Sequence, residues 1–155
     1  MEVCVATMTA RPLWTCPECG RVFAMRNQEH SCERWPLEMH FARKPAIIRE
    51  LFDAVVEVLL AQGPMDIVVG KTSIGFCTRM RFAGAATMRR SLRVGFVLPY
   101  TVESPRVLRV GPYSTHRVMH NVDVRALDEL DDELRAWLIE SYETSLIESF
   151  TRGTR

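Results

Sequence analysis

The feature that most constrains this chain is a spaced set of metal-type side chains near its start. Cys16-Pro-Glu-Cys19-Gly20 is followed by His30-Ser-Cys32. Cysteines separated by two residues lie on one tight turn that aims both thiolates at one ion, and Gly20 allows the left-handed backbone such a turn needs. Three thiolates and one imidazole suit Zn²⁺. Four protein ligands leave no open position for water or substrate, so the predicted zinc site is structural rather than catalytic.

Other assignments of the cysteines and histidines remain open. A lone Cys-x-x-Cys can be a redox pair, but no thioredoxin-like strand-turn-helix pattern follows this one. His40, in the segment after Cys32, is either a competing ligand or a packed or exposed histidine. Cys4 and Cys77 are expected not to be ligands. Cys77 falls in a strand-like run, where a buried thiol behaves as a small apolar residue.

Length, composition and cysteine usage limit the class of protein. The chain has 155 residues, 47% of them hydrophobic and 25% charged, as expected for one core of roughly 100 residues with a small appendage. The sequence contains no run of about 18 apolar residues, which is the length that a membrane-spanning helix needs. The five cysteines are an odd number, and no secretory signal precedes them. We therefore expect a reducing, cytoplasmic compartment and no membrane partner.

The chain divides into four segments. Residues 1–10 are expected to be a flexible lead-in, and residues 11–35 the zinc-binding knuckle. Trp14 and Phe23 flank the knuckle and are expected to form its small core, which needs the metal to fold. Residues 36–43 are predicted to be a linker, and residues 44–150 an α+β domain.

Two helices are predicted to bracket the larger domain. The first runs from about Pro45 to Gln62, before the stop signal Gly63-Pro64. Its apolar face has helical spacing: Ile47, Ile48, Leu51, Phe52, Val55, Val58 and Leu59. The second runs from about Asp131, a suitable N-cap, to Phe150. Its inner stripe is Leu134, Trp137, Leu138, Ser141, Tyr142 and Ser145.

The region between the helices is strand-like. The candidate runs are 66–69, 71–77, 91–98, 106–110 and 117–124, with Pro99, Pro105 and Gly111-Pro112 as breaks. Leu92, Val94, Phe96 and Leu98 share one face of their strand, and Val118, His120, Val122 and Val124 share one face of theirs. No crossover segment is long enough for parallel pairing. The predicted class is α+β: an antiparallel sheet flanked by an N-terminal and a C-terminal helix, preceded by a small zinc-ribbon or knuckle unit.

Charge is unevenly distributed along the larger domain. Residues 71–125 hold ten Lys and Arg against two acids, whereas residues 126–150 hold eight acids against one Arg. Either the basic stretch is a binding face, or the acidic helix packs beside it and neutralises it. The candidate nucleic-acid or anion-binding residues are Lys71, Arg79, Arg81, Arg89, Arg90, Arg93, Arg109 and His116.

The sequence resembles a bacterial family, the domain-of-unknown-function family 5655, in the version with an N-terminal zinc knuckle. The resemblance spans about residues 11–145. It is carried by Trp14-Thr-Cys-Pro-Glu-Cys-Gly-Arg-Val-Phe23, His30-Ser-Cys32, His40-Phe41, Leu51-Phe52, Gly63-Pro64, Lys71-Thr-Ser-Ile-Gly-Phe76, Phe82-Ala83 and the 130–142 segment. It implies a small α+β domain without an assigned activity. It also implies that Lys71 and His116 are family-typical positions, and that Ser141 replaces an alanine.

Three functional hypotheses follow. The first is a non-enzymatic module with structural zinc that binds DNA or RNA through the basic stretch. The second is a protein-interaction or adaptor module that docks through the zinc unit. The third is an enzyme acting on an anionic small molecule in a pocket near Lys71, Arg109 and His116. No catalytic motif supports the third, so an enzyme is the less favoured class.

Overall fold

The apolar face predicted for the first helix is buried. In the computed structural model, which describes residues 12–23 and 25–147, helix α1 (Ala46–Leu60) begins directly after Pro45. Proline suits this position because the first N–H groups of a helix have no acceptor within the helix, so the N–H that proline lacks is not missed. The buried residues of α1 are Ile48, Leu51, Phe52, Val55 and Leu59, and Ile47 and Val58 pack at the edge of the same core. The periodicity of the sequence therefore placed this helix and its inner face correctly.

Helix α2 (Asp132–Ser145) has the predicted N-cap and inner stripe. The Asp131 carboxylate accepts a hydrogen bond from the Leu134 N–H at 3.0 Å. Five stripe residues are buried and Trp137 packs against the core. The predicted end at Phe150 is wrong, because α2 ends at Ser145. The N–H groups of Leu146 and Ile147 bond three residues back, which tightens and terminates the last turn.

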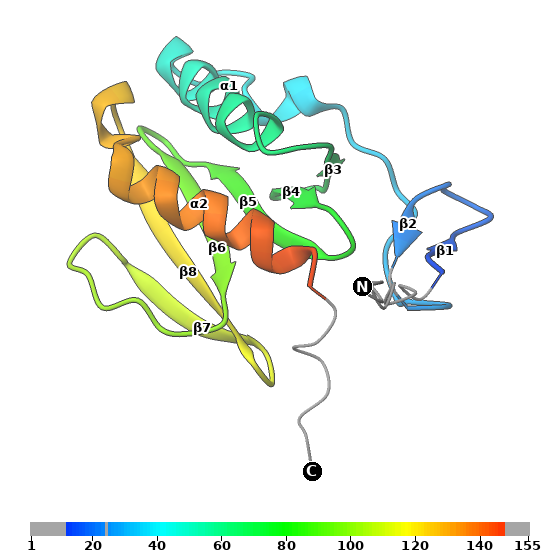
Figure 1. Cartoon of the computed structure of the whole chain (residues 1–155). Helices are drawn as coiled ribbons and strands as arrows, with labels where there is room; N and C mark the ends of the chain where they lie inside the picture. Colours follow the sequence, from blue (N-terminus) through cyan, green and yellow to red (C-terminus); the bar gives the residue numbers. More distant parts are fainter. Residues whose placement is uncertain (1–11, 24, 148–155) are drawn as a thin grey trace, which may run out of the picture. The chain divides into compact units, whose positions relative to one another are not determined.

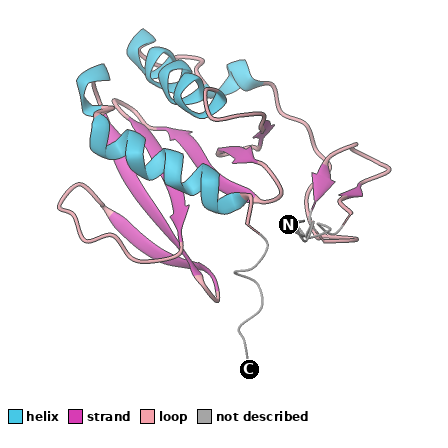
Figure 2. Cartoon of the chain, in the orientation of Figure 1, coloured by secondary structure: helices cyan, strands magenta, loops and turns pink. Residues whose placement is uncertain are grey.

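Six strands form one antiparallel sheet, as predicted. Their spatial order is β3-β4-β5-β6-β8-β7, and both helices lie over one face of the sheet (Figure 1; Figure 2). The strands are β3 (Asp66–Val69), β4 (Ile74–Cys77), β5 (Arg81–Thr87), β6 (Leu92–Leu98), β7 (Arg109–Ser114) and β8 (Arg117–Val124). The fold is therefore a two-layer α+β structure with one core between the helices and the sheet.

The register of the central strands explains the alternation in their sequences. Leu92, Val94 and Phe96 on β6 lie opposite Val124, Val122 and His120 on β8, and all six side chains are buried. The opposite face carries the intervening residues, including Gly75, Gly84 and Gly95. We call this face, which lacks the helices, the outer face of the sheet.

Two parts of the sheet differ from the sequence prediction. Strand β5 was not predicted, because its centre is Ala83-Gly-Ala-Ala86, which lacks the bulky residues that mark strands. Strand β7 includes Gly111 and Pro112, which were predicted to break the strands. Proline is tolerated in β7 because this strand is at the sheet edge, where one side of the backbone has no ladder partner.

The N-terminal region is a separate compact unit. The chain divides between Cys32 and Glu33, and the first unit contains a hairpin of β1 (Trp14–Thr15) and β2 (Val22–Phe23). The second unit begins with a 3-10 helix, η1 (Leu37–His40), within the segment expected to be a linker, and contains a second, η2 (Leu127–Glu129). The expected lead-in 1–10, with Cys4, lies outside the described residues. No helix in the described residues has the length and apolarity that crossing a membrane requires.

Candidate metal centre and basic surface

A tight turn between β1 and β2 positions the first two cysteines. The Cys16 N–H donates to the Arg21 carbonyl and the Gly20 N–H donates to the Cys16 carbonyl, both at 2.9 Å. Gly20 has a φ of 73°, the left-handed conformation expected from the sequence. These bonds close the turn, and both Cys16 and Cys19 are buried.

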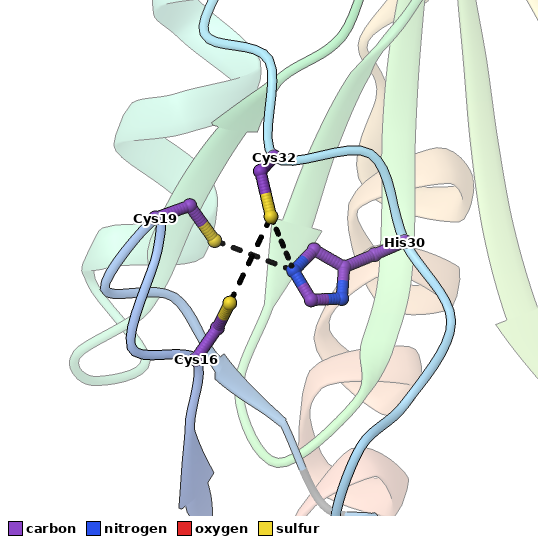
Figure 3. Close-up of side chains that lie close together, drawn as sticks. All are labelled: Cys16, Cys19, His30 and Cys32. Carbon is purple, nitrogen blue, oxygen red and sulfur yellow. Dashed lines mark hydrogen bonds between the residues drawn. The ribbon is translucent and has the colours of Figure 1, made fainter.

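His30 and Cys32 complete a cluster of four ligand atoms (Figure 3). The Cys16 and Cys32 Sγ atoms are 3.8 Å apart. The His30 Nε2 atom is 3.3 Å from the Cys19 Sγ and 3.4 Å from the Cys32 Sγ. A tetrahedral ion with bonds of about 2.3 Å to sulfur and about 2.0 Å to nitrogen requires edges of about 3.8 Å and 3.5 Å. A disulfide would require about 2.05 Å. These three edges match a tetrahedral site, and all four ligand atoms lie within 4.8 Å of one another, so the cluster could hold a metal ion.

The orientation of His30 suits a metal ligand. Its Nδ1 atom lies 2.6 Å from the Gln28 carbonyl, so Nδ1–H donates there and the Nε2 lone pair faces the sulfur atoms. The ring packs on Phe23 with centroids 4.2 Å apart, and Trp14 contacts both rings. Trp14 and Phe23 thus form the small core that the sequence predicted.

The protein environment shifts the pKa values of Cys16 and Cys32 in opposite directions. The backbone N–H of Cys19 lowers the pKa of Cys16 to about 6, whereas burial raises the pKa of Cys32 to about 12. The hydrogen bond to the Gln28 carbonyl raises the pKa of His30. A cation bound among these groups would favour the thiolate of both cysteines, since thiolates are the ligating form.

His40, the alternative ligand, has a different role. It is buried in the second unit, where its Nε2 atom lies 2.8 Å from the Gly70 carbonyl. Its own carbonyl accepts a hydrogen bond from the Thr87 hydroxyl at 2.8 Å. Because these bonds tie η1 to two turns of the sheet, His40 is a packing residue and is not among the four clustered ligands.

Part of the basic stretch is neutralised within the fold. Arg93 holds the Asp123 carboxylate with two hydrogen bonds of 2.7 Å and 3.0 Å. Arg106 contacts Asp131 at 2.7 Å at the start of α2. Arg117 is buried and donates to two carbonyls at the C-terminal end of α2. Arg93 is thus paired within the sheet, whereas Arg106 and Arg117 contact the ends of the acidic helix, as the pairing hypothesis expects.

A different subset of basic residues gathers at one end of the sheet. The antiparallel order brings the β3–β4 turn (residues 70–73) beside the β5–β6 turn (residues 88–91). The segment 40–45 joins both turns through His40 and through Lys44, whose Nζ donates to the Met88 carbonyl at 3.2 Å. We call these three segments the basic end. Its five cations are Arg43, Lys44, Lys71, Arg89 and Arg90, and it contains no acid.

Arg43 and Lys44 were missed by the sequence reasoning. They lie outside the basic stretch 71–125 and come to the basic end only through tertiary contacts. Lys71, Arg89 and Arg90 are exposed there, and the Lys71 ammonium lies 5.9 Å from the centroid of the Trp35 ring. Among the described residues, none of the five cations of the basic end forms an ion pair.

The other candidate residues lie elsewhere. Arg79 is in the β4–β5 turn, at the opposite end of the sheet, and takes part in an interaction of its own. His116 is exposed in the β7–β8 turn, whereas His120 is buried, so the two do not share an environment. Arg109 is on the edge strand β7, four strand positions from β4. At about 4.8 Å per strand, Lys71 and Arg109 are roughly 19 Å apart, too far for one small-ligand pocket.

The fold and the site together define a class of protein: a two-layer α+β domain preceded by a small Cys₃His unit that can bind a metal ion. Comparison with protein-family models gives the family. Residues 37–145 match the domain of unknown function DUF5655, so the chain belongs to the DUF5655 family. Comparisons with curated proteins and with solved structures found no match.

Proposed function

We propose that this protein is a non-enzymatic nucleic-acid-binding module, with Zn²⁺ in the Cys₃His unit and with phosphate contacts at the basic end. The observation that carries the proposal is the basic end itself. Five cations from three segments converge there without an acid in those segments. Phosphate backbones are bound by such clusters of unpaired Lys and Arg.

The proposed zinc has a structural role. Three thiolates favour a soft or borderline ion, and the sulfur–sulfur edge of 3.8 Å equals that of a tetrahedral Zn–S site. With all four positions taken by protein, the metal has no place for substrate. It holds together a unit whose described residues include one ring cluster, made of Trp14, Phe23 and His30.

Zinc is tested by metal analysis and cobalt substitution of the full chain. We expect one zinc ion per chain, and intense visible absorption from tetrahedral Co²⁺ bound by thiolates. Cys32→Ser should weaken binding and change the cobalt spectrum, whereas Cys77→Ser, outside the cluster, should change neither. A chain that binds no zinc, or a cobalt spectrum unaffected by Cys32→Ser, would contradict the assignment.

Nucleic-acid binding is tested by fluorescence anisotropy. The zinc-loaded chain is titrated with short single- and double-stranded DNA and RNA at low and near-physiological salt. If all five cations contact duplex phosphates, the logarithm of the binding constant should fall with the logarithm of salt with a slope of about −4.5. Single strands should bind if Trp35 stacks on a base beside Lys71.

A charge reversal locates the surface. Arg89→Glu with Arg90→Glu should weaken binding for all sequences and reduce the salt slope by about 1.8. The matched control is Arg109→Glu with Arg125→Glu, two exposed arginines outside the basic end. Equal losses in both double variants would show that net charge, and not this surface, governs binding. Absence of binding at either salt concentration would refute the proposal.

One observation favours an adaptor function as the second candidate. The N-terminal unit exposes Leu13, Val22 and Met25, three apolar side chains on about twenty described residues. Apolar side chains on a small, metal-held unit are suitable for contact with another protein. A partner retained after nuclease treatment, and lost with Val22→Asp and Met25→Asp, would favour this function.

A further inference from the structure

The outer face of the sheet carries a cation that the proposed function does not use. The register aligns Gly75, Gly84 and Gly95 in one row across β4, β5 and β6. The Arg81 side chain extends from the start of β5 along this face. A Cβ added at Gly75 would lie 3.1 Å from the Arg81 Nε, and one added at Gly84 would lie 2.7 Å from its Nη2. The guanidinium therefore lies against bare backbone at both positions, and a Cβ at Gly84 would also meet the Ile74 carbonyl at 2.9 Å.

Among the described residues, no carboxylate forms an ion pair with the Arg81 guanidinium. Its Nε atom is buried and has no hydrogen-bond partner in the part of the chain that the structure describes. Its Nη2 atom makes a long contact of 3.5 Å with the Ser73 hydroxyl. A buried guanidinium N–H has no water as an acceptor, although the Arg81 residue as a whole is only half-buried. Arg93 and Arg106, in contrast, have carboxylate partners.

Two acids on the sheet, Asp66 on β3 and Asp123 on β8, do not supply a counter-charge to Arg81. Asp66 lies in the same row as Cys77 and Arg81. It is two strands from β5, so the backbones of Asp66 and Arg81 are roughly 10 Å apart. The Arg81 side chain also extends away from that row, toward Ser73. Asp123 is two strands away on the other side, and both of its oxygens are already bound by Arg93.

We propose that this part of the outer face binds a small phosphate-type anion, with Arg81 as its principal ligand. The planar guanidinium presents paired N–H groups that match two phosphate oxygens, and the Ser73 hydroxyl can donate to a third. The Met119 thioether lies 3.3 Å from the Cβ position of Gly95 and covers the backbone there. The Asn121 amide, whose oxygen lies 3.2 Å from the Cβ position of Gly95, borders the site. This site shares Ser73 with the β3–β4 turn of the basic end, but it uses none of the five cations proposed to bind nucleic acid.

The test is an NMR titration of the full, zinc-loaded, isotope-labelled chain with inorganic phosphate, at ionic strength held constant with chloride. We expect saturable shifts of the Gly75, Gly84 and Gly95 amides and of the Arg81 Nε–H signal. Arg81→Lys keeps the charge but loses the paired donors, and should weaken phosphate binding about tenfold. The matched control is Arg125→Lys, exposed after the end of β8 and outside the glycine row, and should bind as the unchanged chain does.

Two further variants keep the test decisive if Arg81→Lys unfolds. Gly75→Ala retains every charge, and the three atoms nearest its added Cβ all belong to Arg81, at 3.1 Å to 3.3 Å, so it shifts the guanidinium and should also weaken phosphate binding. Ser73→Ala should weaken it less. Shifts that do not saturate, or affinities of Arg81→Lys and Gly75→Ala that equal the affinity of the unchanged chain, would overturn the proposal. Acetate bound as tightly as phosphate would overturn the assignment to phosphate-type anions.

A final comparison separates this site from the proposed function. Phosphate binding should persist in the Arg89→Glu, Arg90→Glu variant, even where nucleic-acid binding is lost. If phosphate shifts disappear in that variant, the anion binds at the basic end and the Arg81 site is refuted. If nucleic acid fails to bind the unchanged chain but phosphate binds at Arg81, only the proposed function fails.

Discussion

Replacement of Asp131 should reveal how the basic and acidic halves of the larger domain hold each other. One carboxylate oxygen of Asp131 caps the Leu134 N–H at 3.0 Å and contacts Arg106 at 2.7 Å. Asp131→Ala removes both interactions. Loss of an N-cap costs about 1 kcal/mol, and loss of a partly exposed ion pair costs about 0.5 kcal/mol. We therefore expect the free energy of unfolding to fall by about 1.5 kcal/mol.

Asp131→Asn separates the two contributions. Asparagine caps helices as well as aspartate does, so this variant keeps the cap and loses the charge. It should cost only about 0.5 kcal/mol. The Leu134 N–H and Arg106 also lower the pKa of Asp131. Its contribution to stability is therefore present above the unfolded-state pKa of about 3.9 and is lost as the pH falls through the folded-state value.

Urea unfolding followed by circular dichroism measures these differences. A double-mutant cycle with Arg106→Ala gives the pair energy directly. Equal losses for Asp131→Ala and Asp131→Asn would refute the capping argument, and a loss below about 0.3 kcal/mol for Asp131→Ala would refute both contributions. Arg106→Ala should leave nucleic-acid affinity unchanged, because Arg106 is engaged by α2 and lies outside the basic end.

Three further predictions follow. If the proposed zinc is bound, its removal with a strong chelator should broaden or shift the amide signals of residues 12–32 while those of residues 37–145 persist, because a unit of this size would depend on the metal; unchanged signals would contradict this. Burial lowers the pKa of His120, so the unfolded state binds the proton more tightly. Stability should therefore fall as the pH drops below about 6.5, by at most about 1.4 kcal/mol per pH unit, and His120→Gln should flatten that dependence in urea titrations. Tyr142→Phe removes the hydrogen bond to the Pro64 carbonyl at 3.0 Å and should cost about 1 kcal/mol in the same assay; a neutral effect would show that the bond contributes nothing.

The division of the basic stretch explains why net charge was an ambiguous guide to function. The same count of arginines is compatible with internal pairing and with an external binding face. Arg93 and Arg106 are bound to carboxylates, whereas Arg89 and Arg90 form no ion pair among the described residues. Only the contacts of each guanidinium distinguish the two roles.

Local patterns in the sequence determined the Cys₃His cluster, both helices and the buried faces of β6 and β8. These features depend on interactions between residues near in sequence. The Cys-x-x-Cys turn is closed by its own backbone, and the periods of 3.6 and 2 directly state which side chains share a face. The sequence could also place the N-cap at Asp131, because capping involves residues three apart.

Tertiary structure alone decided the rest, because those features join residues far apart in the chain. Strand β5 is built from small residues and is recognised only by its neighbours on both sides. Lys44 reaches the basic end through Met88, and Arg81 lies over Gly84 because glycine leaves that space. Which cations are neutralised and which remain without an ion pair depends on strand order. Strand order follows from long-range packing, which a local pattern does not encode.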